Sequence, residues 1–107
     1  MSWNVVILPK ARKDYYFIID YLSNFYPSTP NRFHFAYKKI LRQLEFNPFG
    51  WSVYYDHPAY RRALIGKYTL LYKIDDERHE VHIHRIIRSN WDISELLQKD
   101  DEPGEEN

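Results

Sequence analysis

Two hydrophobic periods follow one another at the start of this chain, the first typical of a strand and the second of a helix. The segment W-N-V-V-I-L, Trp3 to Leu8, is rich in β-branched side chains and precedes Pro9, which lacks the N–H that a central strand requires. From about Lys10, apolar residues recur at helical spacing with polar residues between them, which predicts a helix with one core-facing stripe. The stripe consists of Tyr15, Ile18, Ile19, Leu22 and Phe25 or Tyr26.

A proline-rich break, F-Y-P-S-T-P-N, separates this helix from a second one. Thr29-Pro30 matches an N-cap followed by proline at the first helical position, and the helical pattern then continues to about Asn47-Pro48. Two helices of similar length joined by a short loop predict an antiparallel helical hairpin. The apolar stripe of the second helix is Phe33, Ala36, Tyr37, Ile40, Leu41 and Leu44.

The two-residue period returns in the second half of the chain. Between Tyr60 and Asp75, Gly66-Lys67 divides two strand-like runs, and after the turn D-D-E-R residues 80–87 form a last strand. Short turns between successive strands imply an antiparallel meander. The expected fold class is α+β: an N-terminal strand, an antiparallel helical hairpin, then a three-stranded antiparallel meander, with the hairpin packed on one sheet face. Residues 92–97 are expected to add a helical turn.

The length of 107 residues predicts one domain, because a chain of this size buries about two thirds of its unfolded surface in a single core. We assign residues 1–99 to this domain. Residues 100–107, D-D-E-P-G-E-E-N, contain acids, proline and glycine but nothing apolar, so we expect a disordered acidic tail. The formal net charge is zero, but five of the 15 acidic residues lie in this tail, which leaves residues 1–99 with a net charge of +5.

The residue types that are missing exclude several classes of protein. The chain has no cysteine, which excludes a disulfide framework, thiolate catalysis and Cys-ligated zinc. The first apolar run is too short for a signal-peptide core or a membrane span. We therefore expect a cytoplasmic protein without a membrane partner.

The stretch E-V-H-I-H-R-I-I-R-S-N-W-D, Glu80 to Asp92, contains the clearest candidate chemistry. His82 and His84 share one face of the last strand because side chains alternate at a period of two. Such a pair can ligate zinc, but a zinc site needs three or four ligands and no further ligand stands at a fixed spacing. We predict no metal and no cofactor. A solvated strand face with two neutral rings is an alternative explanation of the pair.

Basic residues are concentrated in the three strands of the meander. Arg85 has the strand parity of apolar Val81 and Ile83, so either both sheet faces are partly covered there or a bulge turns Arg85 outward. We expect the cations to gather on the sheet face opposite the helices and at its rim, where they suit phosphate contacts, base stacking or an acidic protein partner. The candidate target-binding residues are Arg61, Arg62, Lys67, Lys73, Arg85, Arg88 and Trp91.

Catalytic motifs are scarce in this sequence, which has no Gly-rich phosphate loop, no paired carboxylates at helical spacing and no serine elbow. If the protein cleaves a substrate, we expect metal-independent RNA scission, in which the protein supplies a base, an acid and a cation for the phosphorane charge. The candidates for these roles are His82, His84, Arg61, Arg62 and Arg85. Nothing in their spacing requires catalysis.

The C-terminal half, Y-R-R-A-L-I-G-K-Y-T-L-L-Y-K-I-D and V-H-I-H-R-I-I-R-S-N-W-D, resembles the RelE/ParE toxin superfamily. The pattern of that superfamily is a basic strand, Gly-x-Tyr-x-x-x-Tyr, an acidic turn and a β-branched strand that ends in arginine. The residues that fit it are Gly66, Tyr68, Tyr72, Asp75, Ile83, Arg85, Ile86 and Asp92. With the helical hairpin and the exit N-P-F-G, the resemblance covers about residues 3 to 97.

The resemblance implies a small bacterial toxin that a cognate antitoxin neutralises, with the pair often repressing its own operon on operator DNA and serving plasmid stabilisation. It implies one of two poisons. One branch of the superfamily cuts mRNA on the ribosome, and the other inhibits growth by binding DNA gyrase without being a nuclease. Which segment of the toxin the antitoxin occupies stays open, with the apolar groove beside the hairpin and the basic strand face as the two expected docking surfaces.

Departures from the RNA-cutting pattern favour the gyrase branch. Thr69 stands where that branch usually has arginine, and Ala63 where it has lysine. Trp91 stands in place of the arginine, histidine or tyrosine expected near the end of the domain, with only Arg88 close by. We therefore predict a ParE-like gyrase inhibitor, with a RelE-like endoribonuclease and an inactive toxin-fold binding protein as the alternatives.

Overall fold

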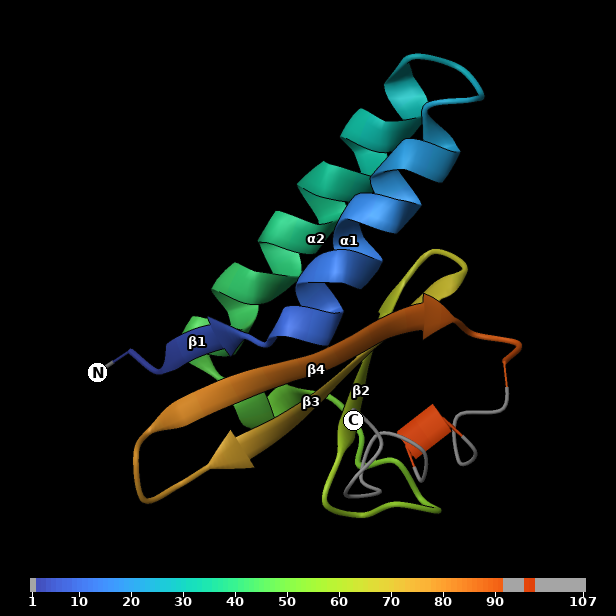
Figure 1. The fold of residues 1–107 in the computed structure, drawn as a ribbon. Helices are drawn as coiled ribbons and strands as arrows, with labels where there is room; N and C mark the ends of the chain where they lie inside the picture. Colours follow the sequence, from blue (N-terminus) through green and yellow to red (C-terminus); the bar gives the residue numbers. More distant parts are fainter. Residues whose placement is uncertain (1, 92–95, 98–107) are drawn as a thin grey trace.

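The computed structural model describes residues 2–91 and 96–97 and confirms the expected α+β order (Figure 1). The predicted helical turn at 92–97 lies outside these residues except for Leu96 and Leu97, and the acidic tail lies wholly outside them. The elements are β1 (Asn4–Ile7), α1 (Pro9–Leu22), α2 (Ser28–Phe46), the short 3-10 helix η1 (Pro48–Gly50), β2 (Arg61–Ile65), β3 (Tyr68–Asp75) and β4 (Glu80–Arg88).

The strands form one four-stranded sheet in the order β1-β4-β3-β2. Strands β2, β3 and β4 are the predicted antiparallel meander. Strand β1 pairs in parallel with β4, in a register that runs from Asn4 opposite Glu80 to Ile7 opposite Ile83. The first strand of the chain therefore lies beside the last one, and it covers only the first half of β4.

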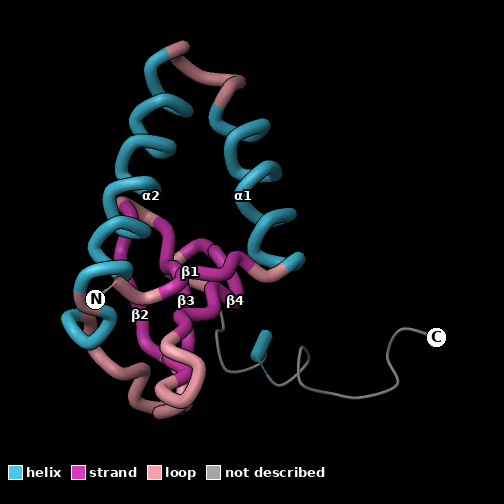
Figure 2. Tube along the Cα trace, turned by 90° about the vertical axis from the view of Figure 1, so that its left-hand side faces the viewer, coloured by secondary structure: helices cyan, strands magenta, loops and turns pink. Residues whose placement is uncertain are grey.

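The helical hairpin packs on one face of the sheet and projects beyond it (Figures 1 and 2). The main core lies between the hairpin and this face. Its fully buried members include Leu44 of α2, Leu70 and Tyr72 of β3, and Ile83 of β4. Because Tyr72 buries a large ring, its hydroxyl needs a partner, and it donates a hydrogen bond of 2.6 Å to the carbonyl oxygen of Pro48.

The opposite face is more covered than the sequence predicted. Leu71 and Ile87 on this face are buried in a second cluster with Tyr60, from the loop before β2, and with Leu97. The expectation that this side of the sheet lies free is therefore wrong for its central part. Strands with apolar side chains on both faces must be covered on both faces. Tyr60 and Leu97 provide this cover for Leu71 and Ile87.

The hairpin tip differs from the prediction at both helix ends. Helix α1 ends at Leu22, and Phe25 and Tyr26 are 54% and 80% exposed instead of continuing the core stripe. Helix α2 begins at Ser28, so Thr29 lies inside the helix and is not its N-cap. The exposure of the two rings follows from the position of the tip, which extends past the sheet and offers no core against which they could pack (Figure 2).

A β-bulge in β4 explains the irregular parity of Arg85. Leu71 lies opposite Arg85 and Tyr72 opposite Ile83, so His84 is an extra residue without a partner position in β3. A bulge was one of the two explanations considered from the sequence.

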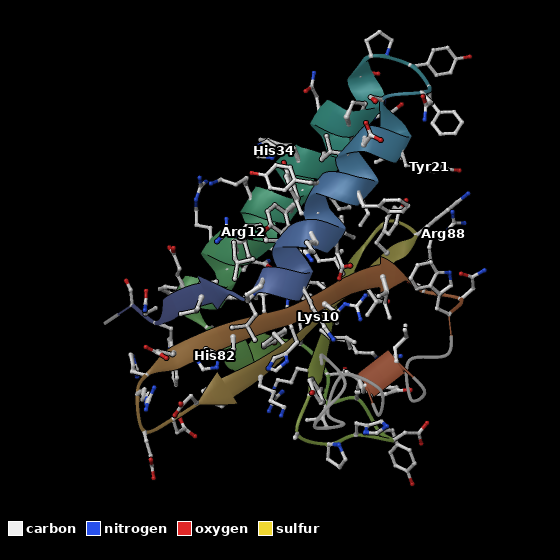
Figure 3. The ribbon with its side chains drawn as sticks, viewed as in Figure 1. Lys10, Arg12, Tyr21, His34, His82 and Arg88 are labelled. Atoms are coloured by element: carbon white, nitrogen blue, oxygen red, sulfur yellow. The ribbon has the colours of Figure 1, made fainter. Side chains whose placement is uncertain are left out.

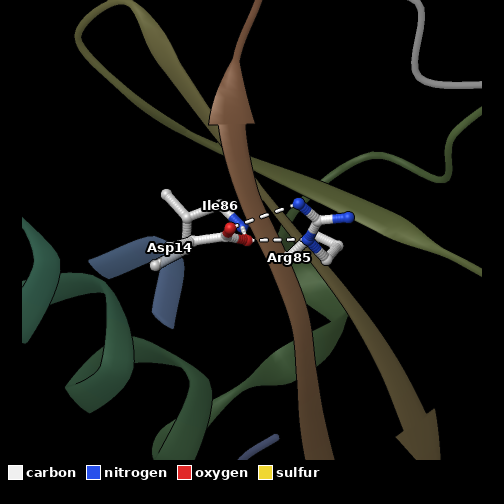
Figure 4. A network of polar contacts seen from close by, with 3 residues as sticks. All are labelled: Asp14, Arg85 and Ile86. Atoms are coloured by element: carbon white, nitrogen blue, oxygen red, sulfur yellow. Dashed lines mark hydrogen bonds and ion pairs between the residues drawn. The ribbon is translucent and has the colours of Figure 1, made fainter. Parts of the chain in front are cut away.

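Asp14 of α1 closes the edge of β4 where β1 has ended (Figure 4). Its Oδ2 accepts a hydrogen bond of 2.9 Å from the backbone N–H of Ile86 and another of 2.7 Å from Nε of Arg85, while Oδ1 accepts from Nη2 at 3.2 Å. The Asp14 and Arg85 side chains are only 17% and 15% exposed. One carboxylate thus binds helix to sheet and satisfies an edge amide that β1 no longer reaches.

Replacing this carboxylate should destabilise the fold. We expect Asp14→Ala to lower the free energy of unfolding by about 2 to 4 kcal/mol, because it removes the acceptor of an edge amide and an ion pair of a largely buried guanidinium. Urea denaturation measures the change. Asp20→Ala, an exposed acid on the same helix, is the matched control and should change stability by less than about 0.5 kcal/mol. Equal losses in both variants would contradict the role assigned to Asp14.

Candidate functional site

The structure brings four of the candidate residues together on the sheet face opposite the helices. Arg62 lies opposite buried Leu71, and Lys73 lies opposite His82 in the next row. His84, at the bulge, contacts the Tyr60 ring at a centroid distance of 5.2 Å. We call the surface formed by Arg62, Lys73, His82 and His84 the open sheet face.

The two cations of the open sheet face lie on aromatic rings of the preceding loop. The guanidinium of Arg62 lies 5.1 Å from the centroid of the Tyr54 ring, and Nζ of Lys73 lies 4.6 Å from the centroid of Tyr60. Cation–π contacts of this kind hold the charges in place while leaving part of each side chain in water. The face therefore presents oriented cations and histidines.

The histidines on this face are also engaged within the protein. Nε2 of His82 and Oε1 of Glu80 are 2.8 Å apart, and both side chains are about a quarter exposed. Asp75 joins them, because it lies opposite Glu80, and the three potential ligand atoms lie within 4.8 Å of one another. Sequence reasoning paired His82 with His84 and missed this group, which only the register across the β3–β4 turn reveals.

Two predicted members have guanidinium groups engaged within the fold. Arg61 lies opposite Tyr72 on the helix side of the sheet, whereas Arg85 lies opposite Leu71 on the other side and turns to Asp14 at the sheet edge. Nη1 of Arg61 donates a hydrogen bond of 2.6 Å to the carbonyl oxygen of Trp51, and its guanidinium lies 5.4 Å from the Phe49 ring centroid. Arg85 is paired with Asp14. The sequence itself indicated the side on which Arg61 lies, because Arg61 is two residues before Ala63, which is buried under the helices. The contacts of both arginines therefore support the fold.

The remaining three predicted residues meet at the far end of the sheet. The N–H of Ser89 donates to the carbonyl oxygen of Lys67, which places the β2–β3 turn beside the exit of β4. Arg88 lies with its guanidinium 5.9 Å from the Tyr68 ring centroid, and Trp91 is 47% exposed. Lys67, Arg88 and Trp91 are therefore neighbours at one end of the molecule.

Hollows beside α1 extend this end of the molecule into a groove. Two adjoining hollows of about 280 and 550 Å³ share Tyr21, Tyr68 and Arg88. Tyr21 and Arg88 lie on the same side of the molecule in Figure 3. We call this surface the hairpin-end groove, and its principal side chains are Phe17, Tyr21, Phe25, Arg32, Lys67, Tyr68, Arg88 and Trp91. Phe17, Tyr21 and Phe25 recur at every fourth position, and this spacing is the signal that the sequence carried for the groove. All three are exposed in the structure. The groove combines exposed aromatic rings with arginine and lysine and suits a protein partner.

The two positions at which the sequence departs from the RNA-cutting pattern, Thr69 and Ala63, are closed in this structure. Thr69 is 1% exposed, and its hydroxyl lies 2.8 Å from that of Ser89. Ala63 is fully buried in the main core. Neither position presents a side chain to a substrate.

The architecture defines a class, the small α+β toxins of RelE type, and solved structures of this class are similar to the chain. The RelBE2 toxin–antitoxin complex from Mycobacterium tuberculosis matches with a TM-score of 0.55 and 22% identity, over 82% of this chain and 99% of that chain. The isolated E. coli RelE toxin matches with a TM-score of 0.56 and 15% identity, over 91% of this chain and 97% of that one. Likeness at this level of identity establishes the fold.

The family follows from the sequence. A family model described as the ParE toxin of the type II toxin–antitoxin system parDE matches residues 5–92. The chain belongs to this family and is a type II toxin of the RelE/ParE superfamily, as the resemblance implied. Among curated proteins, no significant match is found. Within the described residues, none of the helices combines the length and the apolar character needed to cross a membrane.

Substitution should distinguish Arg61, which is hydrogen-bonded to the Trp51 carbonyl, from its equally half-buried neighbour Arg62. We expect Arg61→Met to lower the free energy of unfolding by about 1 to 3 kcal/mol, because it removes a charged hydrogen bond that fixes the loop after α2. Arg62→Met should cost less than about 1 kcal/mol, since it loses only a cation–π contact. Urea denaturation of both variants tests this order, and the reverse order would refute the assignment of Arg61 to the fold.

Stability should also fall in strong alkali. Burial raises the pKa of Tyr72 to about 12, with the nearby Arg61 guanidinium lowering it in part. The unfolded chain ionises tyrosine near pH 10, so the contribution of the neutral hydroxyl is complete below about pH 10 and is lost as the pH rises through about 12. Denaturation measured across this range should show a steeper decline for the wild type than for Tyr72→Phe. Tyr55→Phe, whose ring is 90% exposed, should behave as the wild type does.

Proposed function

We propose that this chain is the toxin of a bacterial type II module that inhibits growth by binding DNA gyrase in the cytoplasm. The observation that carries the proposal is the match to the ParE toxin family over residues 5–92. The geometry supports it, because Arg61 and Arg85 of the candidate cleavage set are held by the fold, and Thr69 and Ala63 are buried. A toxin that acts by binding its target needs a recognition surface and does not need catalytic residues.

The hairpin-end groove is the surface we assign to the target. Lys67, Arg88 and Trp91, three of the seven predicted target-binding residues, converge there beside exposed Phe17 and Tyr21. Arginine, tyrosine and tryptophan are the residue types that contribute most binding energy in protein interfaces. Gyrase would therefore contact the far end of the sheet, with Arg62 and Lys73 outside the main contact.

We further propose a cognate antitoxin as the natural partner. The similar RelBE2 structure is a toxin–antitoxin complex. The hairpin-end groove suits an antitoxin segment with an apolar face and acidic flanks, since it pairs aromatic rings with Arg32, Lys67 and Arg88. An antitoxin bound there would compete directly with the target. We also propose that the toxin–antitoxin complex represses its own operon by binding operator DNA.

A second function, ribosome-dependent mRNA cleavage, has one observation in its favour. The open sheet face holds Lys73, His82 and His84 together with Arg62, which would supply a base, an acid and a cation for attack by a 2′-hydroxyl. This set differs from the one expected from the sequence, because Arg61 and Arg85 are not part of it.

Two assays on the purified protein distinguish these functions. We expect inhibition of gyrase supercoiling, and a translating extract with primer extension on the message should show no new cleavage. The double variant Lys67→Ala with Arg88→Ala should weaken gyrase inhibition at least about tenfold, because two interface cations are lost. Lys13→Ala with Lys39→Ala removes the same charge from exposed helix positions and should leave inhibition unchanged.

Other results would reassign the function. Message cleavage that is lost in His82→Ala would replace gyrase binding with the ribonuclease function. No effect in either assay, with cells tolerating expression in the absence of an antitoxin gene, would identify an inactive binding protein.

A further inference from the structure

A cleft of about 280 Å³ lies between α1 and α2, apart from both surfaces described above. Helix α1 contributes Arg12, Tyr15 and Tyr16 at helical spacing, and α2 contributes a matching set at the same spacing. The α2 set is His34, Tyr37, Lys38 and Leu41, and Ile7 closes one end. Arg12 and His34 lie on the same side of the hairpin in Figure 3, and Tyr21 and Arg88 of the hairpin-end groove lie on the other side.

The charge of this cleft has one sign. Its described lining contains Arg12 and Lys38 and no acidic residue. Neither cation has an ion-pair partner among the residues that the structure describes. Two exposed cations on facing helices therefore carry a charge of about +2 at neutral pH, which matches the charge of about −1.5 to −2 on a phosphate monoester.

The cleft also holds a directed hydrogen-bond donor. The Tyr15 hydroxyl lies 2.5 Å from Nδ1 of His34. Burial, with a smaller contribution from Tyr16, raises the pKa of Tyr15 and so favours its hydroxyl as a hydrogen-bond donor. In the tautomer that accepts this hydrogen bond at Nδ1, His34 carries its proton on Nε2, on the far side of the ring. This N–H can donate to an anion.

Aromatic rings provide the rest of the lining. Tyr15 packs on Tyr37 at a centroid distance of 4.7 Å, and Tyr37 is 5% exposed, so this wall is rigid. Tyr16 is 62% exposed and meets Tyr15 edge-on at 5.3 Å, which leaves a ring face for a planar group. Planar bases stack on such faces with little regard to their identity.

We propose that the cleft between α1 and α2 binds a mononucleotide, with its phosphate between Arg12, Lys38 and His34 and its base on Tyr16. The site is separate from the proposed gyrase contact and does not depend on it. A phosphate is favoured over a carboxylate because donors converge from two helices, and a tetrahedral dianion accepts hydrogen bonds from several directions at once.

Titration of the full chain with adenosine monophosphate and with inorganic phosphate tests the proposal. Both probes should shift the His34 ring resonances in NMR spectra, with the nucleotide binding more tightly. Arg12→Ala and Lys38→Ala should each weaken nucleotide binding about tenfold, because each loses a charge-assisted contact. Tyr16→Ala should bring the affinity for the nucleotide down to that for inorganic phosphate.

Matched controls and contrary outcomes are available in the same chain. Lys13→Ala and Lys39→Ala remove a charge one residue away on the same helices, outside the cleft lining, and should leave binding unchanged. Circular dichroism checks that the Arg12→Ala and Lys38→Ala variants remain folded. Equal weakening by Arg12→Ala and Lys13→Ala, nucleotide shifts confined to the open sheet face, or no shift at millimolar nucleotide would each overturn the proposal. Tighter binding of a tetraglutamate peptide in the same cleft would replace the nucleotide with an acidic protein segment.

Discussion

The contact on which the arrangement of this toxin depends is the carboxylate of Asp14 at the edge of β4. Strand β1 pairs with β4 only as far as Ile83, after which the chain turns at Pro9 into α1. Beyond that point the backbone N–H of Ile86 and Nε of the largely buried Arg85 both donate to Asp14. Asp14 satisfies both, and it thereby fixes the position of α1 on the sheet. The hairpin-end groove and the interhelical cleft lie on the two sides of the helix that this contact places.

Much of the fold follows from periodicity alone. The β-branched run before Pro9, the two helical stripes and the strand-like runs after Tyr60 predicted the four strands and the helices α1 and α2 in order. The parallel pairing of β1 with β4 could not be predicted, since nothing local in either strand specifies a partner so distant in the chain. The exposure of Phe25 and Tyr26 was also missed, because spacing shows which side chains share a face but not whether the sheet extends beneath them.

The candidate site was harder to predict than the fold, for a physical reason. Cations near a sheet can be ligands for a partner or supports for the chain, and composition does not distinguish the two. Arg61 and Arg85 are supports, as their short contacts to the Trp51 carbonyl and to Asp14 show. The parity of Arg61 with Ala63 was a usable signal, whereas the position of Arg85 depended on the bulge at His84, which interrupts the alternation. The superfamily was recognised from the order of several weak motifs, and the family model supports that assignment.

The parallel pairing of β1 with β4 has a consequence for the birth of this protein on the ribosome. Residues 4–7 emerge early, yet their hydrogen-bonding partner, residues 80–83, is among the later segments of the described chain to be made. Helices can form from local contacts during synthesis, but a sheet edge closed by such distant segments must wait for both. The sheet is therefore completed late in translation. The hairpin-end groove, which includes the exit of β4, can take its final shape only after that step.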